Sequence, residues 1–153
     1  MRDREVINRF CGFYLFGIDE YRKDMDDFLG DTLKKINKFD QTKLDQLETY
    51  FLRSMKNCYL LFDQDGFRRR KLQENKRSLI NVGLFDVFAT LMGKYSESQI
   101  EQARETLRQK FYEIQEQEEF VNSIYLGTNQ VSKVRTRFEW IERMLNEVIP
   151  DVK

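Results

Sequence analysis

The side chains of this sequence that could do chemistry are mainly carboxylates and guanidinium groups, because the chain contains no histidine. Without an imidazole there is no Ser-His-Asp triad and no histidine ligand for zinc. The two cysteines, Cys11 and Cys58, are too few for a zinc site. Each lies in an apolar run, which is typical of a buried free thiol in a cytoplasmic protein. We therefore predict no catalytic residue, no metal ion and no cofactor.

Two groups of carboxylates resemble metal sites, but each has a simpler structural explanation. The segment 63–74 begins with Asp-Gln-Asp-Gly and ends with a glutamate at the twelfth position, as a calcium loop does. Its sixth position, where glycine is needed, is Arg68, so we interpret it as a turn after a helix. The three aspartates of 24–27 stand where a helix should begin, and carboxylates there cap free N–H groups and favour the helix dipole.

Basic side chains gather in two segments. The segment 68–77 carries six positive charges against one glutamate, and three more basic residues lie in 133–137. Because the formal net charge is zero, attraction to nucleic acid must come from a local surface of this kind. A run of arginines is more often solvated or paired within the protein. The candidate DNA-contacting residues are Arg68, Arg69, Arg70, Lys71, Lys133, Arg135 and Arg137.

A polar pair, Thr128 and Asn129, follows Gly127 just before the last apolar stripe. Its simplest interpretation is an N-cap pair for the last helix. The alternative is that its backbone N–H groups contact a phosphate.

Helices must position these groups, because the apolar residues recur at helical spacing and there is one proline. We expect about six helices, near 3–16, 24–38, 40–62, 82–94, 96–126 and 131–148, the fifth being long or kinked. A further short turn of helix is considered at 67–72, followed by a loop at 73–80. The predicted caps are Asp24, Asp40 or Thr42, Asn81, and Ser96 with Gln99. The prediction is an all-α fold in which residues 1–153 form one orthogonal or bundle-like array without a sheet.

The first helix is apolar around its whole circumference from Phe10 to Phe16, apart from Gly12. Such a helix lies at the centre of a fold or is covered by a partner. We expect its N-terminal end to leave an apolar patch that is covered in a homodimer or by a missing domain. The candidate interface residues are Val6, Ile7, Phe10 and Phe13.

Three parts of the chain, in order, carry a family resemblance. They are 3–14 with 25–29, then 62–68 with 80–86, and then 120–137. In this order the chain resembles the C-terminal helical part of the bacterial family known as domain of unknown function 262. Its members include the GmrS-type subunits of modification-dependent restriction systems.

The resemblance implies a partner for this chain. Family members join a ParB- and sulfiredoxin-like N-terminal half, with an Asp-Gly-Gln-Gln-Arg motif linked to nucleotide hydrolysis, to a helical half, and some add an HNH nuclease. This sequence contains neither that motif nor a histidine. We therefore expect a non-catalytic, cytoplasmic accessory domain of a GmrS-like DNA-restriction and phage-defence protein. It would pack on a ParB-like nucleotide-binding half, or on a homologous protein, and contact DNA.

The alternative is a stand-alone helical protein-interaction module with no role on DNA. Neither interpretation involves a membrane, because no stretch approaches the roughly 20 apolar residues that span a bilayer.

Overall fold

The computed structural model describes residues 2–22, 24–69 and 78–150. Within these ranges there are seven α-helices and no strand, apart from an isolated bridge between Arg68 and Ile80. The all-α prediction is therefore confirmed. The helices are α1 (Arg2–Phe16), α2 (Met25–Ile36), α3 (Gln41–Phe62), α4 (Val82–Met92), α5 (Glu97–Ile114), α6 (Glu118–Ser123) and α7 (Val131–Val148), with single 3-10 turns at Ile18–Glu20 and Asp63–Asp65.

Four of the predicted helix starts are confirmed by side-chain caps. The carboxylate of Asp24 accepts a hydrogen bond from the backbone N–H of Asp27 at 2.8 Å, which explains the acidic group there as capping. Asp40, rather than Thr42, caps α3. Asn81 caps α4 through its side-chain oxygen, and Ser96 and Gln99 form a reciprocal capping box at the start of α5.

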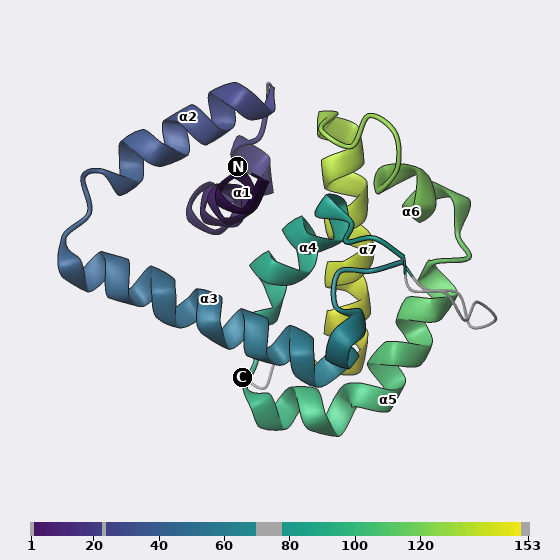
Figure 1. The fold of residues 1–153 in the computed structure, drawn as a ribbon. Coiled ribbons are helices and arrows are strands. Elements are labelled where there is room, and N and C mark those ends of the chain that lie inside the picture. The colour runs from purple at the N-terminus through teal and green to yellow at the C-terminus, as the bar shows by residue number, and fades with distance from the viewer. Residues whose placement is uncertain (1, 23, 70–77, 151–153) are drawn as a thin grey trace.

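The helix α4 lies in the middle of the molecule, and α1, α3 and α7 pack around it (Figure 1). Every residue of α4 from Gly83 to Met92 is buried. The helix α5 packs against α3 and α7, and α6 packs against α7. Among the described residues, no helix is both long enough and apolar enough to cross a membrane. The central helix of the fold is thus α4, not the first helix.

The expected long fifth helix is divided in two. The helix α5 ends at Ile114, and α6 begins at Glu118 after an extended residue, Gln117. The buried side chains Phe111 and Phe120 flank this break, and their rings meet edge to face with centroids 6.3 Å apart. The acidic pair at the start of α6 favours a helix N-terminus at that point. The prediction of one long or kinked helix over 96–126 was wrong, because a turn at 115–117 within the polar run separates two helices.

The helix α1 packs closely on α2. A Cβ atom at Gly12 would lie 2.5 Å from the Phe28 ring and 2.8 Å from the Thr32 hydroxyl, so only glycine fits this crossing. Phe10 and Phe13 are both 1% exposed, and the ring of Phe13 contacts those of Phe28 and Phe138. Phe10 and Phe13 therefore belong to the interior of this chain, whereas Tyr14 and Phe16 are half-buried.

Candidate nucleic-acid interface

A buried ionic cluster lies where α1, α4 and α7 meet. Arg9 approaches Asp86 side-on, with Nε 2.9 Å from Oδ1 and Nη2 against Oδ2. Arg137 donates from Nη2 to the same Oδ2 at 2.8 Å. All three side chains are at most 2% exposed. Burying two guanidinium groups with one carboxylate leaves an excess positive charge in the interior, so the remaining donors need other acceptors.

Burial acts to lower the pKa of both guanidinium groups, but their surroundings differ. In Arg9 the effect of burial is outweighed by the hydrogen bonds and charge of Asp86, and its pKa is raised. In Arg137 burial is the larger effect, opposed by Asp86, and its pKa is lowered. This difference agrees with the geometry, because Arg9 makes the two-pronged contact with the carboxylate and Arg137 a single one.

The remaining donors of the cluster hold the connection between α6 and α7. Arg137 Nη1 donates to the carbonyl oxygens of Thr128 at 2.6 Å and Ser123 at 3.1 Å. Arg9 Nη1 donates to Asn129 Oδ1 at 3.1 Å, and the Tyr21 hydroxyl donates to the Asn129 carbonyl. The segment 124–130 is therefore fixed from inside the protein.

These contacts overturn the predicted N-cap at Thr128 and Asn129. The N-cap residue of α7 is Gln130, and it makes no side-chain capping bond. The side chain of Asn129 is engaged by Arg9 instead, which is far away in the sequence. The alternative, a phosphate contact by the backbone N–H groups of Thr128 and Asn129, stays a prediction.

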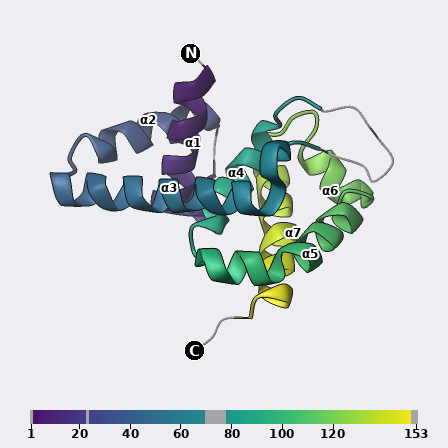
Figure 2. The same ribbon diagram turned by 60° about the horizontal axis from the view of Figure 1, so that its bottom comes forward.

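A second connection, which leads into α4, lies beside this one (Figures 1 and 2). Asn81 Nδ2 donates to the carbonyl oxygen of Ile124 at 2.8 Å. The backbone N–H of Asn81 donates to the carbonyl oxygen of Phe67, and Arg68 forms an isolated β-bridge with Ile80. The first arm of this connection, 67–69, is thus bonded to its second arm, 78–81. The two connections form one continuous face.

This face combines basic and exposed apolar side chains. The Arg69 guanidinium lies over the Tyr125 ring, 5.0 Å from its centroid, and donates to the Tyr125 hydroxyl at 2.7 Å. Lys133 donates to the carbonyl of Leu126. Leu79 and Leu126 are 88% and 85% exposed and lie on the two adjacent connections. We call Arg68, Arg69, Leu79, Ile80, Tyr125, Leu126 and Lys133 the loop surface.

The predicted DNA-contacting residues that the structure describes divide into three groups. Arg68, Arg69 and Lys133 lie together on the loop surface, although the sequence places them in two separate segments. Arg135 is partly exposed and pairs with Asp19 at 3.4 Å. Two further candidates, Arg70 and Lys71, lie outside the described residues.

The third group is Arg137, for which the prediction of a DNA contact was wrong. Its side chain is 0% exposed and its terminal nitrogens are directed at Asp86, Ser123 and Thr128. A guanidinium enclosed in this way has no surface to offer a phosphate. Its role is to hold the loop.

The predicted interface on α1 is also corrected in part. Phe10 and Phe13 are buried within this chain and are not free to contact a partner. Val6 is half-buried, and Ile7 is 47% exposed. The apolar patch expected at the N-terminal end of α1 is therefore confined to these two residues, and its covering by a homodimer or a missing domain stays a prediction.

The first carboxylate of the segment that resembled a calcium loop, Asp63, is engaged by two arginines. Asp63 Oδ2 accepts from Arg104 at 2.8 Å and from Arg108 at 3.0 Å, at the end of α3. Within the described part of the chain, no group of three or more histidine, cysteine or acidic side chains could hold a metal ion. Asp63 therefore joins the end of α3 to α5.

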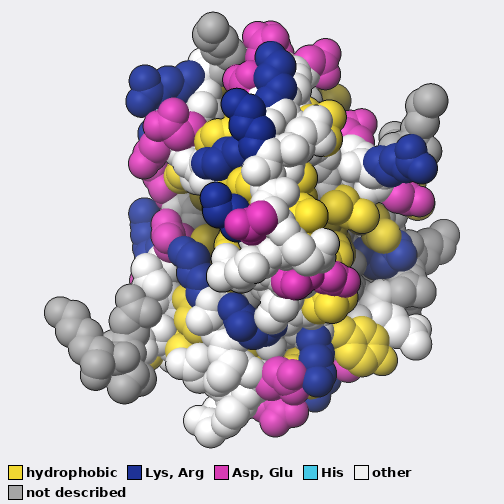
Figure 3. Space-filling model, turned by 90° about the vertical axis from the view of Figure 1, so that its left-hand side faces the viewer, with side chains coloured by type: hydrophobic (Ala, Val, Ile, Leu, Met, Phe, Trp, Pro, Cys, Tyr) yellow, Lys and Arg dark blue, Asp and Glu magenta, His cyan; other side chains and the backbone are white. Residues whose placement is uncertain are grey.

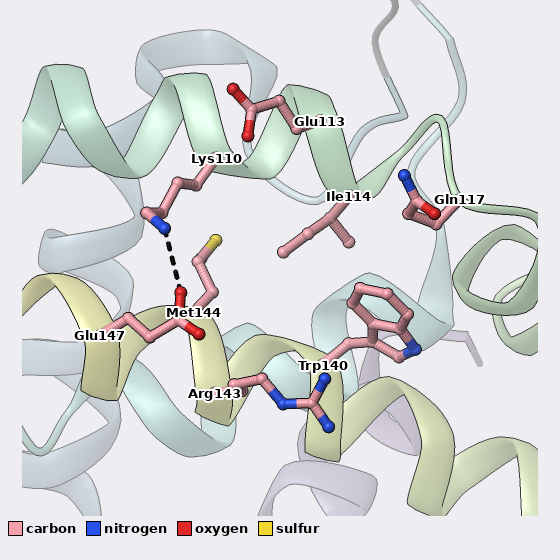
Figure 4. A pocket seen from close by; sticks show the side chains of 8 residues that line it. All are labelled: Lys110, Glu113, Ile114, Gln117, Trp140, Arg143, Met144 and Glu147. Carbon is pink, nitrogen blue, oxygen red and sulfur yellow. Dashed lines mark hydrogen bonds and ion pairs between the residues drawn. The ribbon is translucent and has the colours of Figure 1, made fainter.

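A groove of about 260 Å³ lies between α5 and α7 (Figure 4). The indole of Trp140, the only tryptophan, forms one wall with Ile114 and Met144. Arg143 lies over that indole, 5.6 Å from its centroid, and Lys110 pairs with Glu147 at 3.0 Å across the groove. The groove thus contains another Arg–aromatic pair, remote in sequence from the one on the loop surface.

The face around the connection between α2 and α3 differs from the loop surface. There, lysine and arginine side chains are interspersed with aspartate and glutamate (Figure 3). Charges of both signs at close spacing cancel at the distance of a DNA backbone, so this face is a poor candidate for binding DNA.

Comparison with family models, curated proteins and solved structures finds no match to this chain.

Sequence reasoning did not identify Arg9, Asp86 or Tyr125 as parts of a site. One signal for the cluster was present, because Asp86 is the only charged residue in the otherwise apolar helix α4. Another was the phase of Arg137, three residues after Val134 and four before Ile141, which places it on the buried stripe of α7. Nothing in the sequence near Tyr125 predicts its place in the site, because its partner Arg69 lies on another connection.

Proposed function

We propose that this chain is a non-catalytic helical accessory domain of a GmrS-like DNA-restriction and phage-defence protein. In this proposal it acts in the bacterial cytoplasm, packs on a ParB-like nucleotide-binding half and contacts DNA through the loop surface. The nucleotide chemistry belongs to that half.

One observation supports the family proposal above the others. The three parts of the sequence that carry the resemblance each contribute to the same buried cluster. Arg9 comes from the first, Asp86 from the second, and Asn129 with Arg137 from the third. Short motifs that are distant in sequence are expected to occur together in a protein family when their side chains bond to one another in the folded chain. Each motif then depends on the others for its hydrogen-bond partners.

The DNA contact is supported by charge. The loop surface brings together Arg68, Arg69 and Lys133, and Arg68 also borders a small pocket that Asp63 and Asp65 line. The sequence between its two arms, 70–77, adds four basic residues and one glutamate. Arginine and lysine at such a density favour phosphate contacts, which position a protein on DNA without reading its sequence.

Salt-dependent binding to duplex DNA tests this proposal. Affinity for a fluorescently labelled duplex is measured by anisotropy at several salt concentrations. We expect the logarithm of the association constant to fall linearly with the logarithm of salt concentration. The double variant R69A/K133A should bind more weakly, and its slope should be lower by about one unit for each phosphate that it no longer neutralises.

The matched control is R143A, which removes an arginine that also lies over an aromatic ring but borders the groove between α5 and α7. It should leave affinity and slope unchanged. Absence of salt-dependent binding in the unsubstituted protein would contradict the DNA role. A protein partner found in its place would favour the stand-alone interaction module.

A further inference from the structure

We propose that the loop surface recognises DNA bases that are unpaired and unstacked, in preference to an uninterrupted duplex. This inference rests on the proposed function, because it names the form of DNA that the same surface takes. Three features of the surface carry it: an aromatic platform, two exposed leucines and a rigid support.

The aromatic platform is the Tyr125 ring. Arg69 covers part of it at 5.0 Å, yet the residue remains 51% exposed. An aromatic ring with an arginine over part of it, and with other surface exposed, can also stack against one nucleobase. Every base has such a face, but in an intact duplex both faces are covered by neighbouring base pairs. Stacking on Tyr125 therefore requires a base that has left the helix.

The exposed leucines point to the same form of DNA. Leu79 and Leu126 lie on the two adjacent connections and are almost fully exposed. The outside of B-form DNA presents phosphates and sugars, which gain nothing from an aliphatic side chain. Base faces are the largest apolar surface of nucleic acid, and proteins that reach them insert apolar side chains between base steps, which unstacks the bases. The leucines suit that contact.

The support beneath these residues is rigid, which lowers the entropy cost of binding. Asn129 is held by Arg9 and Tyr21, and Thr128 is held by Arg137. Gln130 bonds back to Gly127, which adopts a φ of 67°. Tyr125 and Leu126 are thus presented on a connection that the buried cluster has already fixed.

The basic residues complete the site. Arg68 and Lys133 each donate to a backbone carbonyl and carry a positive charge at the surface. Phosphates on either side of an unstacked base lie within reach of such groups, which explains why cations and apolar side chains occupy one face. A purely protein-binding surface of this shape would instead require a partner with acidic side chains around an apolar centre.

The test compares two labelled DNAs of equal length that share one strand, which is annealed either to its full complement or to a strand that leaves a central run of thymidines mismatched. We expect the protein to bind the mismatched DNA about tenfold more tightly, on the scale of one stacked base. The variants Y125L and L126S should each remove most of that preference. Their effect on binding to the fully paired DNA should be smaller, because the basic residues that contact its phosphates remain.

The matched controls are Y59L and L52S, which change exposed residues of the same types on α3. Both should keep the preference, and circular dichroism would verify that all four variants fold. Equal binding to the two DNAs, or equal effects of Y125L and Y59L, would overturn the inference while the proposed function stands. Failure to bind either DNA, with capture of an acidic peptide instead, would overturn both.

Discussion

Arg9 and Arg137, near opposite ends of the chain, donate to the same oxygen atom, Oδ2 of Asp86. This shared acceptor joins α1 and α7 through the central helix α4. The donors left over reach out to Thr128 and Asn129. One buried carboxylate therefore links the core of the fold to the connection that carries Tyr125.

The substitution D86N should strongly destabilise the protein. It leaves two buried guanidinium groups without a counter-charge, and breaking a buried ion pair in this way costs about 3–5 kcal/mol. The free energy of unfolding is measured by denaturant titration. The control E101Q, at an exposed position of α5, should change it by no more than about 0.5 kcal/mol. A D86N loss as small as that of E101Q would show that the cluster contributes little.

Two glycines should respond to alanine in opposite directions. G12A places a methyl group 2.5 Å from the Phe28 ring and should destabilise the protein by about 1–3 kcal/mol, as overpacking does. G30A, in the interior of α2, meets no atom within 4 Å and should stabilise the helix by about 0.5–1 kcal/mol. Thermal melting of both variants checks this pair. A stabilising G12A would mean that α1 and α2 do not cross so closely.

The helices and their caps could be predicted from the sequence because those signals are local. Both kinds of signal lie within a single helix: the helical spacing of Leu47, Cys58 and Phe62, and the cap at Asp40. The break at Gln117 could not be found in this way, because the apolar stripe resumes near the same phase on both sides of it. The buried side chains Phe111 and Phe120, on either side of the break, meet each other in the core.

The site was predicted only in part, for a different reason. Arg68, Arg69 and Lys133 were recognisable as cations, but their meeting depends on two connections lying side by side. The sequence alone places Arg137 wrongly because a charged side chain is ordinarily exposed. Burial of a charge depends on a partner such as Asp86, which is distant in sequence.

The two cysteines should be unreactive in the folded protein. Burial raises the pKa of Cys11 to about 11 and also raises the pKa of Cys58, so neither forms the reactive thiolate near neutral pH. A chromogenic disulfide reagent should label both only after denaturation. Rapid labelling of either thiol in native protein would contradict this burial.

The raised pKa of Cys11 makes the stability of the fold depend on pH. Because the pKa of Cys11 rises from 9.0 to about 11 on folding, the protonated thiol is favoured in the folded state. Its contribution to stability is fully present below pH 9.0 and is lost as pH rises through about 11. C11A should therefore flatten the loss of stability over that interval, as measured by unfolding at each pH. An unchanged pH profile would assign the alkaline loss to other groups.

Tyr21 should position the loop surface without touching DNA. Y21F removes the hydroxyl that donates to Asn129, and Y50F removes one that donates to Thr90 at 2.6 Å. Each should cost about 1 kcal/mol of stability, as a typical hydrogen bond does. Only Y21F should also weaken DNA binding, because only its partner lies next to the loop surface. Equal binding by both variants would show that the connection keeps its position without Tyr21.

Mapping the DNA contact residue by residue tests the central proposal most directly. Two-dimensional amide NMR spectra of the isotope-labelled protein are recorded as DNA with a mismatched centre is added. The largest shifts should occur at 68–69, 78–80 and 124–133, with the amides of α2 and the first half of α3 unchanged. Shifts confined to α2 and α3, or spread evenly over the whole chain, would contradict a DNA-binding role for the loop surface.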